Sequence, residues 1–350
     1  DPNADRGWFA VNSVMKSAGL RPLTENLDVP DNAYADGASS LKTIELLNYF
    51  KSENKNFFLT VGFQKPHLPF TPPKKYWDLY DRDKITLSEF QERSKGSPQE
   101  AYHQSGELRN YHDTEPSMDS DGIVNQDKQR ELIHGYMASV SYIDAQVGII
   151  LNHLNSIGLD RNTIVVFLGD HGWHLGDHGL WNKHSNFEEA TRTPLIIKSP
   201  DIDGGFINES PVELLDIFPT LCDLAEIPSP EDLDGVSLLP ILQKKSEVLK
   251  DFAISQYPRR CNVMRSVIGR YPEDCTMMGY AVRNENYRYV AWVSGNFEDR
   301  SDFSKDEILM EELYDYERDP LETISFASDP SYKKIKDNMI RDLRSVIWSK

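Results

Sequence analysis

The sequence contains no apolar stretch of the roughly 18 residues that a membrane-spanning helix needs. Its longest apolar run, TIVVFLGD, has the length of a single β-strand. Apolar residues make up 39% and charged residues 27% of the 350 positions, a composition typical of globular proteins. We therefore expect no membrane partner, and the length suits either two domains or one large α/β domain.

Positive charge is scarce. The chain has 38 lysines and arginines against 56 aspartates and glutamates, which gives a formal net charge of −18. Nucleic-acid binding depends on clustered cationic side chains, so this balance argues against a nucleic-acid partner. A polyanionic ligand can bind such a protein only in a locally basic pocket.

Cysteine is also rare, with three residues, and this small odd number defines no disulfide framework. Cys222 lies in FPTLCDLA, where we expect a buried helix cysteine. Cys261 and Cys275 flank one polar loop. Two alternatives stay open for this pair, a disulfide that closes the loop in an exported protein or two free thiols.

The first two thirds of the chain alternate between helical and strand patterns. SLKTIELLNYFKS has helical spacing, and residues 57–63 form an apolar strand pattern that ends in a proline-bounded loop. A long polar stretch, from about residue 79 to 125, predicts a surface excursion. A long helix pattern over KQRELIHGYMASVSYIDAQVGIILNHLNSIGL is followed by the strand patterns NTIVVFLGD and TPLIIKSP and the helix VELLDIFPTLCDLA. This order indicates an α/β fold with functional loops beyond strand ends.

The last third has a different pattern. FAISQYP, MGYAVRNENYRYVAWV and EELYDYERDP predict antiparallel strands, with a hairpin turn at Asn284-Glu285-Asn286. A helix is expected from about residue 331 to 348. We place the boundary between a larger domain, residues 1–245, and a C-terminal subdomain, residues 246–350.

The densest group of reactive side chains is GDHGWHLGDHGLWNKHSNFEEATRTPL, residues 169–195. Asp170 and His171 stand where the strand ends, a position that suits ligands of a divalent cation or a catalytic dyad. Taken by itself, however, the tripeptide Asp-His-Gly is explained as a helix cap or a turn. Lys183 is either a solvated lysine or the fixed cation of an anion site. His67, between two prolines, suits a general acid or an oxyanion donor but also occurs in inert loops.

These stretches together resemble the sulfatase family. The resemblance is carried, in family order from about residue 57 to 322, by VGFQKPHLPF, GDHGWHLGDHGLWNKHSNFEEATRTPLI, ELLDIFPTLCDLA, DGVSLLPIL, SQYPR, MGYAVRNENYRYVAWV and ELYDYERDPLE. It implies an alkaline-phosphatase-like α/β fold, a large mixed sheet flanked by helices, with a smaller C-terminal antiparallel sheet subdomain. The SQYPR-to-MGY arrangement favours enzymes that remove the 2-O-sulfate of terminal iduronate from heparan sulfate and dermatan sulfate. Another sugar sulfatase of the same subgroup is the close alternative.

The resemblance also implies roles for individual residues. Asp170 and His171 match two ligands of one Ca²⁺ ion. His67 and Lys183 match the histidine and lysine that contact the sulfate group, and Trp173 matches the residue that shapes the uronate pocket. A basic residue between Arg259 and Asp274, with Arg265 or Arg270 as candidates, is expected to receive the uronate carboxylate.

The sequence departs from the family at the nucleophile, a formylglycine made from the cysteine of a Cys-x-Pro-Ser-Arg motif. None of the three cysteines stands in such a motif, and the paired aspartates that complete the calcium site are missing. We therefore expect the formylglycine and the remaining ligands in a segment that precedes residue 1. The alternatives are a non-catalytic remnant that binds anionic glycans and, with less support, a phosphodiesterase of the same superfamily. A lysosomal or secreted glycoprotein is expected by resemblance, with one sequon at Asn208-Glu209-Ser210.

Overall fold

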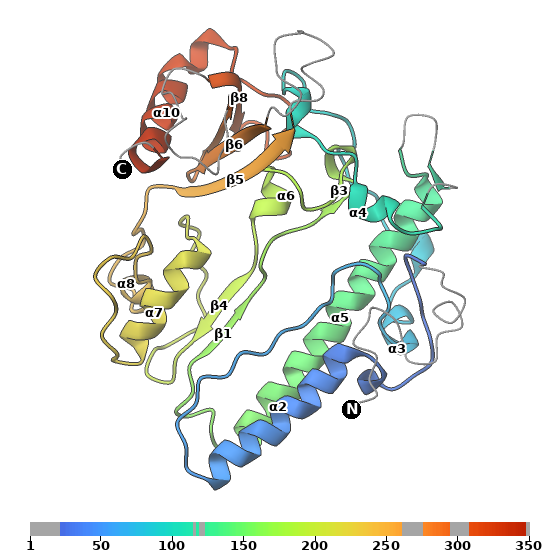
Figure 1. Ribbon diagram of the computed structural model, residues 1–350, viewed down its shortest axis with the longest axis vertical. Helices are drawn as coiled ribbons and strands as arrows, with labels where there is room; N and C mark the ends of the chain where they lie inside the picture. Colours follow the sequence, from blue (N-terminus) through green and yellow to red (C-terminus); the bar gives the residue numbers. More distant parts are fainter. Residues whose placement is uncertain (1–21, 115–116, 119–122, 261–275, 295–307, 348–350) are drawn as a thin grey trace. The chain divides into compact units, whose positions relative to one another are not determined.

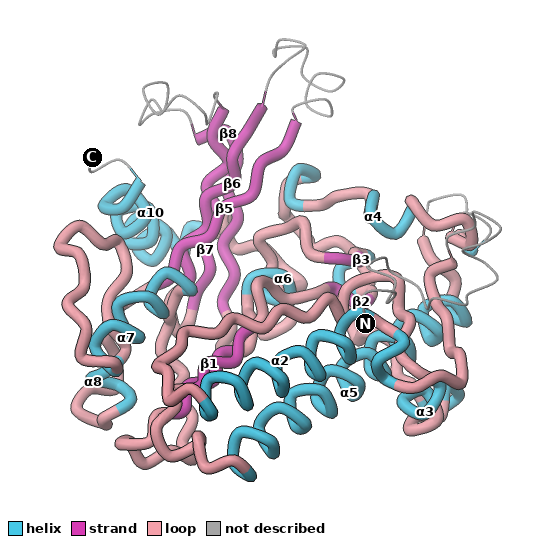
Figure 2. Tube along the Cα trace, turned by 60° about the horizontal axis from the view of Figure 1, so that its bottom comes forward, coloured by secondary structure: helices cyan, strands magenta, loops and turns pink. Residues whose placement is uncertain are grey.

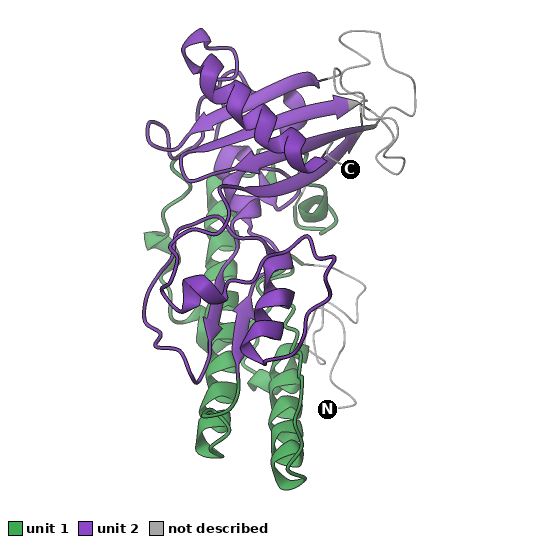
Figure 3. Cartoon of the chain, turned by 90° about the vertical axis from the view of Figure 1, so that its left-hand side faces the viewer, with its two compact units in different colours: residues 1–89, 104–163 green, residues 90–103, 164–350 purple. Residues whose placement is uncertain are grey.

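The computed structural model describes residues 22–114, 117–118, 123–260, 276–294 and 308–347. The chain divides into two compact units, one made of residues 1–89 and 104–163 and the other of residues 90–103 and 164–350 (Figure 3). No helix in the described part of the chain is long and apolar enough to cross a bilayer. The predicted division into residues 1–245 and 246–350 stays a prediction.

The first unit is built on two helices that lie side by side, α2 (Ala35–Ser52) and α5 (Gln126–Ser156) (Figures 1 and 2). The side chain of Asn125 caps α5 by accepting a hydrogen bond from the backbone N–H of Lys128 at 2.9 Å. The buried Tyr142 of α5 donates to Asp31 O at 2.9 Å and accepts from Gly37 N, at the start of α2, at 2.7 Å. This tyrosine therefore fixes one helix against the other.

Short elements complete the first unit: η1 (Asp31–Ala33), α3 (Lys74–Trp77), η2 (Arg82–Lys84) and α4 (Gly106–Arg109). Gly135 of α5 allows a close approach, because a Cβ there would lie 2.6 Å from Phe70 Cβ. The predicted strand over residues 57–63 is extended, but within the described residues it pairs with no other strand. Within this segment, Phe58 is 81% exposed.

The second unit contains two short antiparallel strand pairs. β1 (Val165–Leu168) pairs with β4 (Leu195–Lys198), and β2 (His174–Leu175) pairs with β3 (Trp181–Asn182). The β1–β4 register runs antiparallel, from Val165–Lys198 to Leu168–Leu195. Between these strands lie η5 (Asp177–Gly179) and α6 (Glu188–Thr191), and after them η6 (Leu214–Asp216), α7 (Ile217–Leu224) and α8 (Leu239–Leu242).

The C-terminal sheet was predicted correctly. Four antiparallel strands stand in the order β5 (Ala253–Arg260), β6 (Thr276–Arg283), β7 (Tyr287–Ser294) and β8 (Ile308–Asp315) (Figure 2). The β6–β7 turn falls at the expected Asn284-Glu285-Asn286, where Asn284 Oδ1 accepts from the N–H groups of Asn286 and Tyr287. The last helix, α10 (Lys333–Ile347), matches the predicted one within about two residues.

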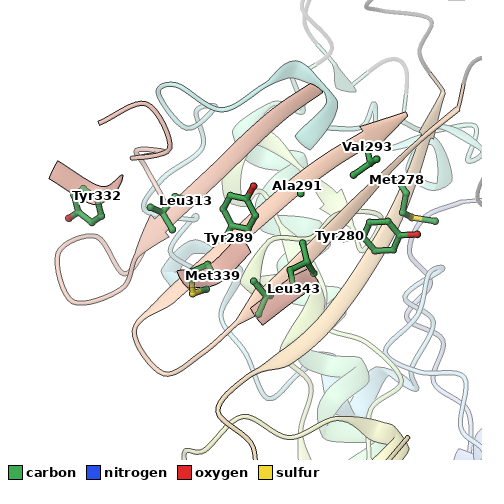
Figure 4. Close-up of a cluster of buried hydrophobic side chains, with 10 residues drawn as sticks. Met278, Tyr280, Tyr289, Ala291, Val293, Leu313, Tyr332, Met339 and Leu343 are labelled. Carbon is green, nitrogen blue, oxygen red and sulfur yellow. The ribbon is translucent and has the colours of Figure 1, made fainter. Parts of the chain in front are cut away.

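The two faces of this sheet have separate cores. Met339 and Leu343 of α10 pack on one face against side chains of β6, β7 and β8 that include Tyr280, Tyr289 and Leu313 (Figure 4). On the other face, sheet residues pack against Leu180 and Phe187; they are Met277, Ala281, Val290, Trp292 and Tyr314. The second core joins the sheet to the segment that carries the reactive side chains.

Candidate functional site

The loop after β1 presents Asp170 and His171 at the protein surface. Asp170 Oδ1 accepts a hydrogen bond from the backbone N–H of His171 at 3.1 Å, and Asp170 Oδ2 lies 3.6 Å from His171 Nε2. His171 Nδ1 lies 2.7 Å from Gly172 O, and a carbonyl only accepts, so this nitrogen carries a proton. The Asp170 side chain is 86% exposed, so its carboxylate is accessible to a cation.

Glycine is required on both sides of this pair. A Cβ on Gly172 would lie 2.0 Å from Glu189 O and 2.7 Å from Arg192 O, and one on Gly169 would lie 2.3 Å from Thr193 Oγ1. The backbone N–H of Gly172 donates to Ala190 O at 2.9 Å. The loop is therefore pressed against α6 and the start of β4, which hold Asp170 and His171 in position.

Trp173 and Lys183 join this pair. Lys183 Nζ lies 5.1 Å from the centroid of the Trp173 ring, within the range of a cation–π contact. The rings of His171 and Trp173 stack with centroids 6.2 Å apart and an interplanar angle of 24°. Four predicted residues therefore form one cluster, which we call the Lys183 cluster: Asp170, His171, Trp173 and Lys183.

The other predicted residues are His67, Arg265 and Arg270. His67 belongs to the first unit, where its Nδ1 lies 2.7 Å from Leu68 O and its Nε2 lies 3.8 Å from Glu107 Oε1. The preceding Lys65 is buried and donates to Pro69 O at 2.7 Å, and burial lowers the pKa of this lysine to about 8. Arg265 and Arg270 lie outside the described residues.

A further cation was not singled out from the sequence. Arg259 of β5 donates to the backbone carbonyl of His184 and lies with its Cζ 4.4 Å from the centroid of the Tyr257 ring. The Tyr257 hydroxyl in turn lies 2.8 Å from His184 Nδ1. The motif SQYPR already contained both residues, but only the folded structure shows that their side chains contact His184, the residue that follows Lys183.

The described residues contain one group of potential metal ligands, and it is separate from the Lys183 cluster. Side-chain atoms of His178, Glu189 and Glu322 lie within 4.8 Å of one another. Glu322 Oε1, however, accepts from Arg288 Nε at 2.6 Å, so a buried guanidinium already occupies the position beside this carboxylate. Calcium prefers six to eight oxygen ligands. Asp170 offers such oxygens, whereas the buried group contains an imidazole and a competing cation.

Comparison with known proteins identifies the family. The sulfatase family model matches residues 4–227, and the model of the N-sulphoglucosamine sulphohydrolase C-terminal region matches residues 176–348. The chain belongs to the sulfatase family. Both matches include Lys183, and the first also includes His67, Asp170 and His171.

Curated relatives include two iduronate 2-sulfatases. The mouse enzyme is 33% identical, and the match covers 87% of this chain and 64% of the mouse enzyme. The human enzyme is also 33% identical, and the match covers 89% of this chain and 65% of the human enzyme. The choline-sulfatase of Rhizobium meliloti is 27% identical over 97% of this chain and 60% of its own length. The chain thus spans a little less than two thirds of the length of these relatives.

Solved structures share the fold. A protein solved in complex with its substrate, D-glucosamine-2-N,6-O-disulfate, has a TM-score of 0.68 at 21% identity, and the match covers 89% of this chain and 69% of that protein's chain. The phosphonate monoester hydrolase of Silicibacter pomeroyi has a TM-score of 0.71 at 20% identity, and the match covers 97% of this chain and 66% of the hydrolase chain. The fold is therefore the alkaline-phosphatase-like α/β fold that the motifs implied. The predicted large mixed sheet is not present among the described residues, whose sheets are the β1–β4 pair, the β2–β3 pair and the four-stranded C-terminal sheet.

Proposed function

We propose that the protein to which these residues belong is a sulfuric ester hydrolase that removes the 2-O-sulfate of terminal iduronate from heparan sulfate and dermatan sulfate. The observation that carries this proposal is the Lys183 cluster. It combines an exposed carboxylate, an imidazole, an indole and an ammonium group within one segment of a sulfatase-family chain. The 33% identity to two iduronate 2-sulfatases supports the choice of sugar.

Lys183 is proposed to neutralise the charge of the sulfate group. Its ammonium lies over the face of Trp173, where the ring limits the directions it can take. A fixed cation stabilises charge that grows on the sulfate oxygens as the ester bond breaks. His67 is proposed to protonate the sugar oxygen that leaves, as a general acid.

Asp170 and His171 are proposed to hold part of a single Ca²⁺ site. Calcium dependence is general for the family. The exposed Asp170 carboxylate fits this ion, while a complete site needs more oxygen ligands than these two residues supply. When bound, the ion would supply positive charge that binds and polarises sulfate oxygens. The sequence contains no Cys-x-Pro-Ser-Arg motif, so the proposed reaction takes its formylglycine from chain outside these 350 residues.

The uronate ring is proposed to lie against Trp173, with its carboxylate received by a cation of the segment that follows β5. Arg265 and Arg270 remain the candidates from the sequence. Arg259 is an alternative from the structure, since its guanidinium is already oriented by the carbonyl of His184 and the ring of Tyr257.

A sulfatase with a different sugar substrate is the second candidate. It is favoured by the match of residues 176–348 to the C-terminal model of N-sulphoglucosamine sulphohydrolase. A Delta 4,5-hexuronate-2-O-sulfatase of Bacteroides thetaiotaomicron is also 32% identical over 58% of this chain. The two candidates differ in the group that an arginine of the segment after β5 would bind.

We propose a lysosomal location, with secretion as the alternative, and N-glycosylation at Asn208. The exposed Asn208 and the half-buried Ser210 form a local turn in which Asn208 Oδ1 accepts from Ser210 N at 3.1 Å and from Ser210 Oγ at 2.8 Å. Peptide mass mapping of the protein from its source would detect a glycan on this asparagine.

The test measures sulfate release by the protein purified from its source, after mass mapping for a formylglycine peptide. We expect turnover of a 2-O-sulfated iduronide and little turnover of a 6-O-sulfated glucosamine. Lys183→Ala and His67→Ala should each abolish most activity, while Lys198→Ala, at an exposed lysine of β4, should not. Preference for the glucosamine ester would favour the second candidate. If the protein has neither formylglycine nor turnover, the result would favour the alternative of a non-catalytic remnant that binds anionic glycans.

A further inference from the structure

Asn182, the residue before Lys183, has an unusual backbone conformation. Its φ is +80°, in the left-handed region that glycine and asparagine adopt more readily than other residues. It is also fully buried at the end of β3, directly opposite His174 of β2. Both features cost stability, so this position calls for a physical explanation.

The side chain of Asn182 does not provide that explanation. Neither its Oδ1 nor its Nδ2 has a hydrogen-bond partner within the described part of the chain, and the same is true of Nδ1 of the opposite His174. A buried polar atom without a partner costs about 1–3 kcal/mol. An apolar residue would avoid this cost, but a β-branched or bulky side chain is poorly tolerated at positive φ. Asparagine therefore suits this position through its backbone conformation and not through its side chain.

The left-handed conformation marks the point where the chain leaves β3. A φ of +80° lies outside the extended region of a strand, so it ends the path of β3 and redirects the residue that follows. Trp181 and Asn182 are buried, and the half-exposed Lys183 comes directly after this turn, with its Nζ 5.1 Å from the centroid of the Trp173 ring.

We infer that Asn182 is a positioning residue whose left-handed backbone directs Lys183 toward Trp173 and so toward the sulfate group. The inference about the direction of Lys183 concerns geometry alone, whereas its consequence for sulfate depends on the proposed function. A residue that enters the left-handed region freely should preserve this direction. A residue that avoids the region should displace the lysine, and displacement of a binding group by about 1 Å can cost about 100-fold in rate.

The experiment compares Asn182→Gly with Asn182→Ala. Glycine keeps the left-handed backbone and removes the amide, while alanine removes the amide and disfavours the backbone. The matched control is the same pair of substitutions at Asn54, an exposed residue of the first unit with φ of +48°. Alanine should destabilise both positions, but only at position 182 should it affect Lys183.

The first measurement is the rate at which Lys183 is acetylated in the folded protein, followed by mass spectrometry. It requires no activity, so it tests the positioning even if the proposed function fails. We expect Asn182→Ala to change this rate several-fold, with Asn182→Gly and both Asn54 variants close to wild type. Equal rates in the alanine and glycine variants at position 182 would overturn the inference.

The second measurement is sulfate-ester turnover, which tests the consequence for sulfate. We expect kcat/KM to fall about 10- to 100-fold in Asn182→Ala and to remain within a few-fold of wild type in Asn182→Gly. An equal loss in both variants would assign the effect to the amide and overturn the backbone explanation. Altered labelling in a protein whose wild type has no turnover would leave the positioning intact and refute the proposed function.

Discussion

Replacement of Glu189 by glutamine tests the electrostatics beside the candidate site. Glu189 is part of α6, and its Oε2 is buried without a hydrogen-bond partner within the described residues, 3.9 Å from His178 Nε2. Burial, followed by the nearby carboxylate of Glu322, raises the pKa of Glu189 from 4.5 to about 8. Burial also lowers the pKa of His178 from 6.5 to about 4. In the folded protein near neutral pH, Glu189 therefore keeps its proton and His178 is uncharged.

The two shifts affect stability in opposite directions. Between pH 4.5 and 8, folded Glu189 retains a proton that the unfolded chain releases, so its contribution to stability falls as pH rises. Between pH 6.5 and 4, the unfolded chain protonates His178 while the folded protein does not, so this contribution falls as pH falls. Of these two contributions, only that of Glu189 changes between pH 6.5 and 8. Over this range we expect the free energy of unfolding of wild type to fall by about 1–2 kcal/mol relative to that of Glu189→Gln, allowing for partial exposure of the side chain.

The assay is urea unfolding of both proteins from pH 5 to 8.5. The free-energy difference between Glu189→Gln and wild type should grow in favour of the variant as pH rises. Glu285→Gln, in the exposed β6–β7 turn, removes the same charge and serves as the control. Parallel pH curves for wild type and Glu189→Gln would refute the assignment of the bound proton to Glu189.

Three further substitutions can be tested by the same unfolding assay. Gly172→Ala should lower the free energy of unfolding by about 1–3 kcal/mol or more, because its Cβ would lie 2.0 Å from Glu189 O. An unchanged urea midpoint would mean that the loop after β1 can move away from this contact at little cost. Glu322→Gln should cost about 3–5 kcal/mol, because it leaves the buried Arg288 guanidinium without its carboxylate; a neutral effect would contradict the ion pair. Leu343→Ala should cost about 2–5 kcal/mol through a cavity beneath α10, with no change in Lys183 acetylation.

Elements set by local sequence were predictable. The long α5 helix and the strands of the C-terminal sheet followed from side-chain periodicity, and the β6–β7 turn followed from its asparagines. Strand pairing was less predictable, because it depends on partners distant in the sequence. Residues 57–63 differ from the expectation for this reason, since they pair with no strand among the described residues.

The burial of charged side chains also could not be predicted from the sequence. Arg288 stands in the strand YRYVAWVS, where an arginine ordinarily indicates a solvent-facing position. In the structure it is 1% exposed, because Glu322, 34 positions later, supplies a carboxylate at 2.6 Å. Such a pair becomes recognisable only when the fold brings the two residues together.

The candidate site was predictable to the extent that it is local. Asp170, His171, Trp173 and Lys183 lie within one short segment that follows a predicted strand, which limits how far apart they can be in the fold. The geometry of that segment depends on positions with no reactive chemistry. Gly172 fits beneath α6 only without a side chain, and the left-handed backbone of Asn182 brings Lys183 to the surface. The reactive residues of this loop could therefore be selected from the sequence by their side-chain chemistry. The residues that orient them are identified only in the structure, from backbone angles and close contacts.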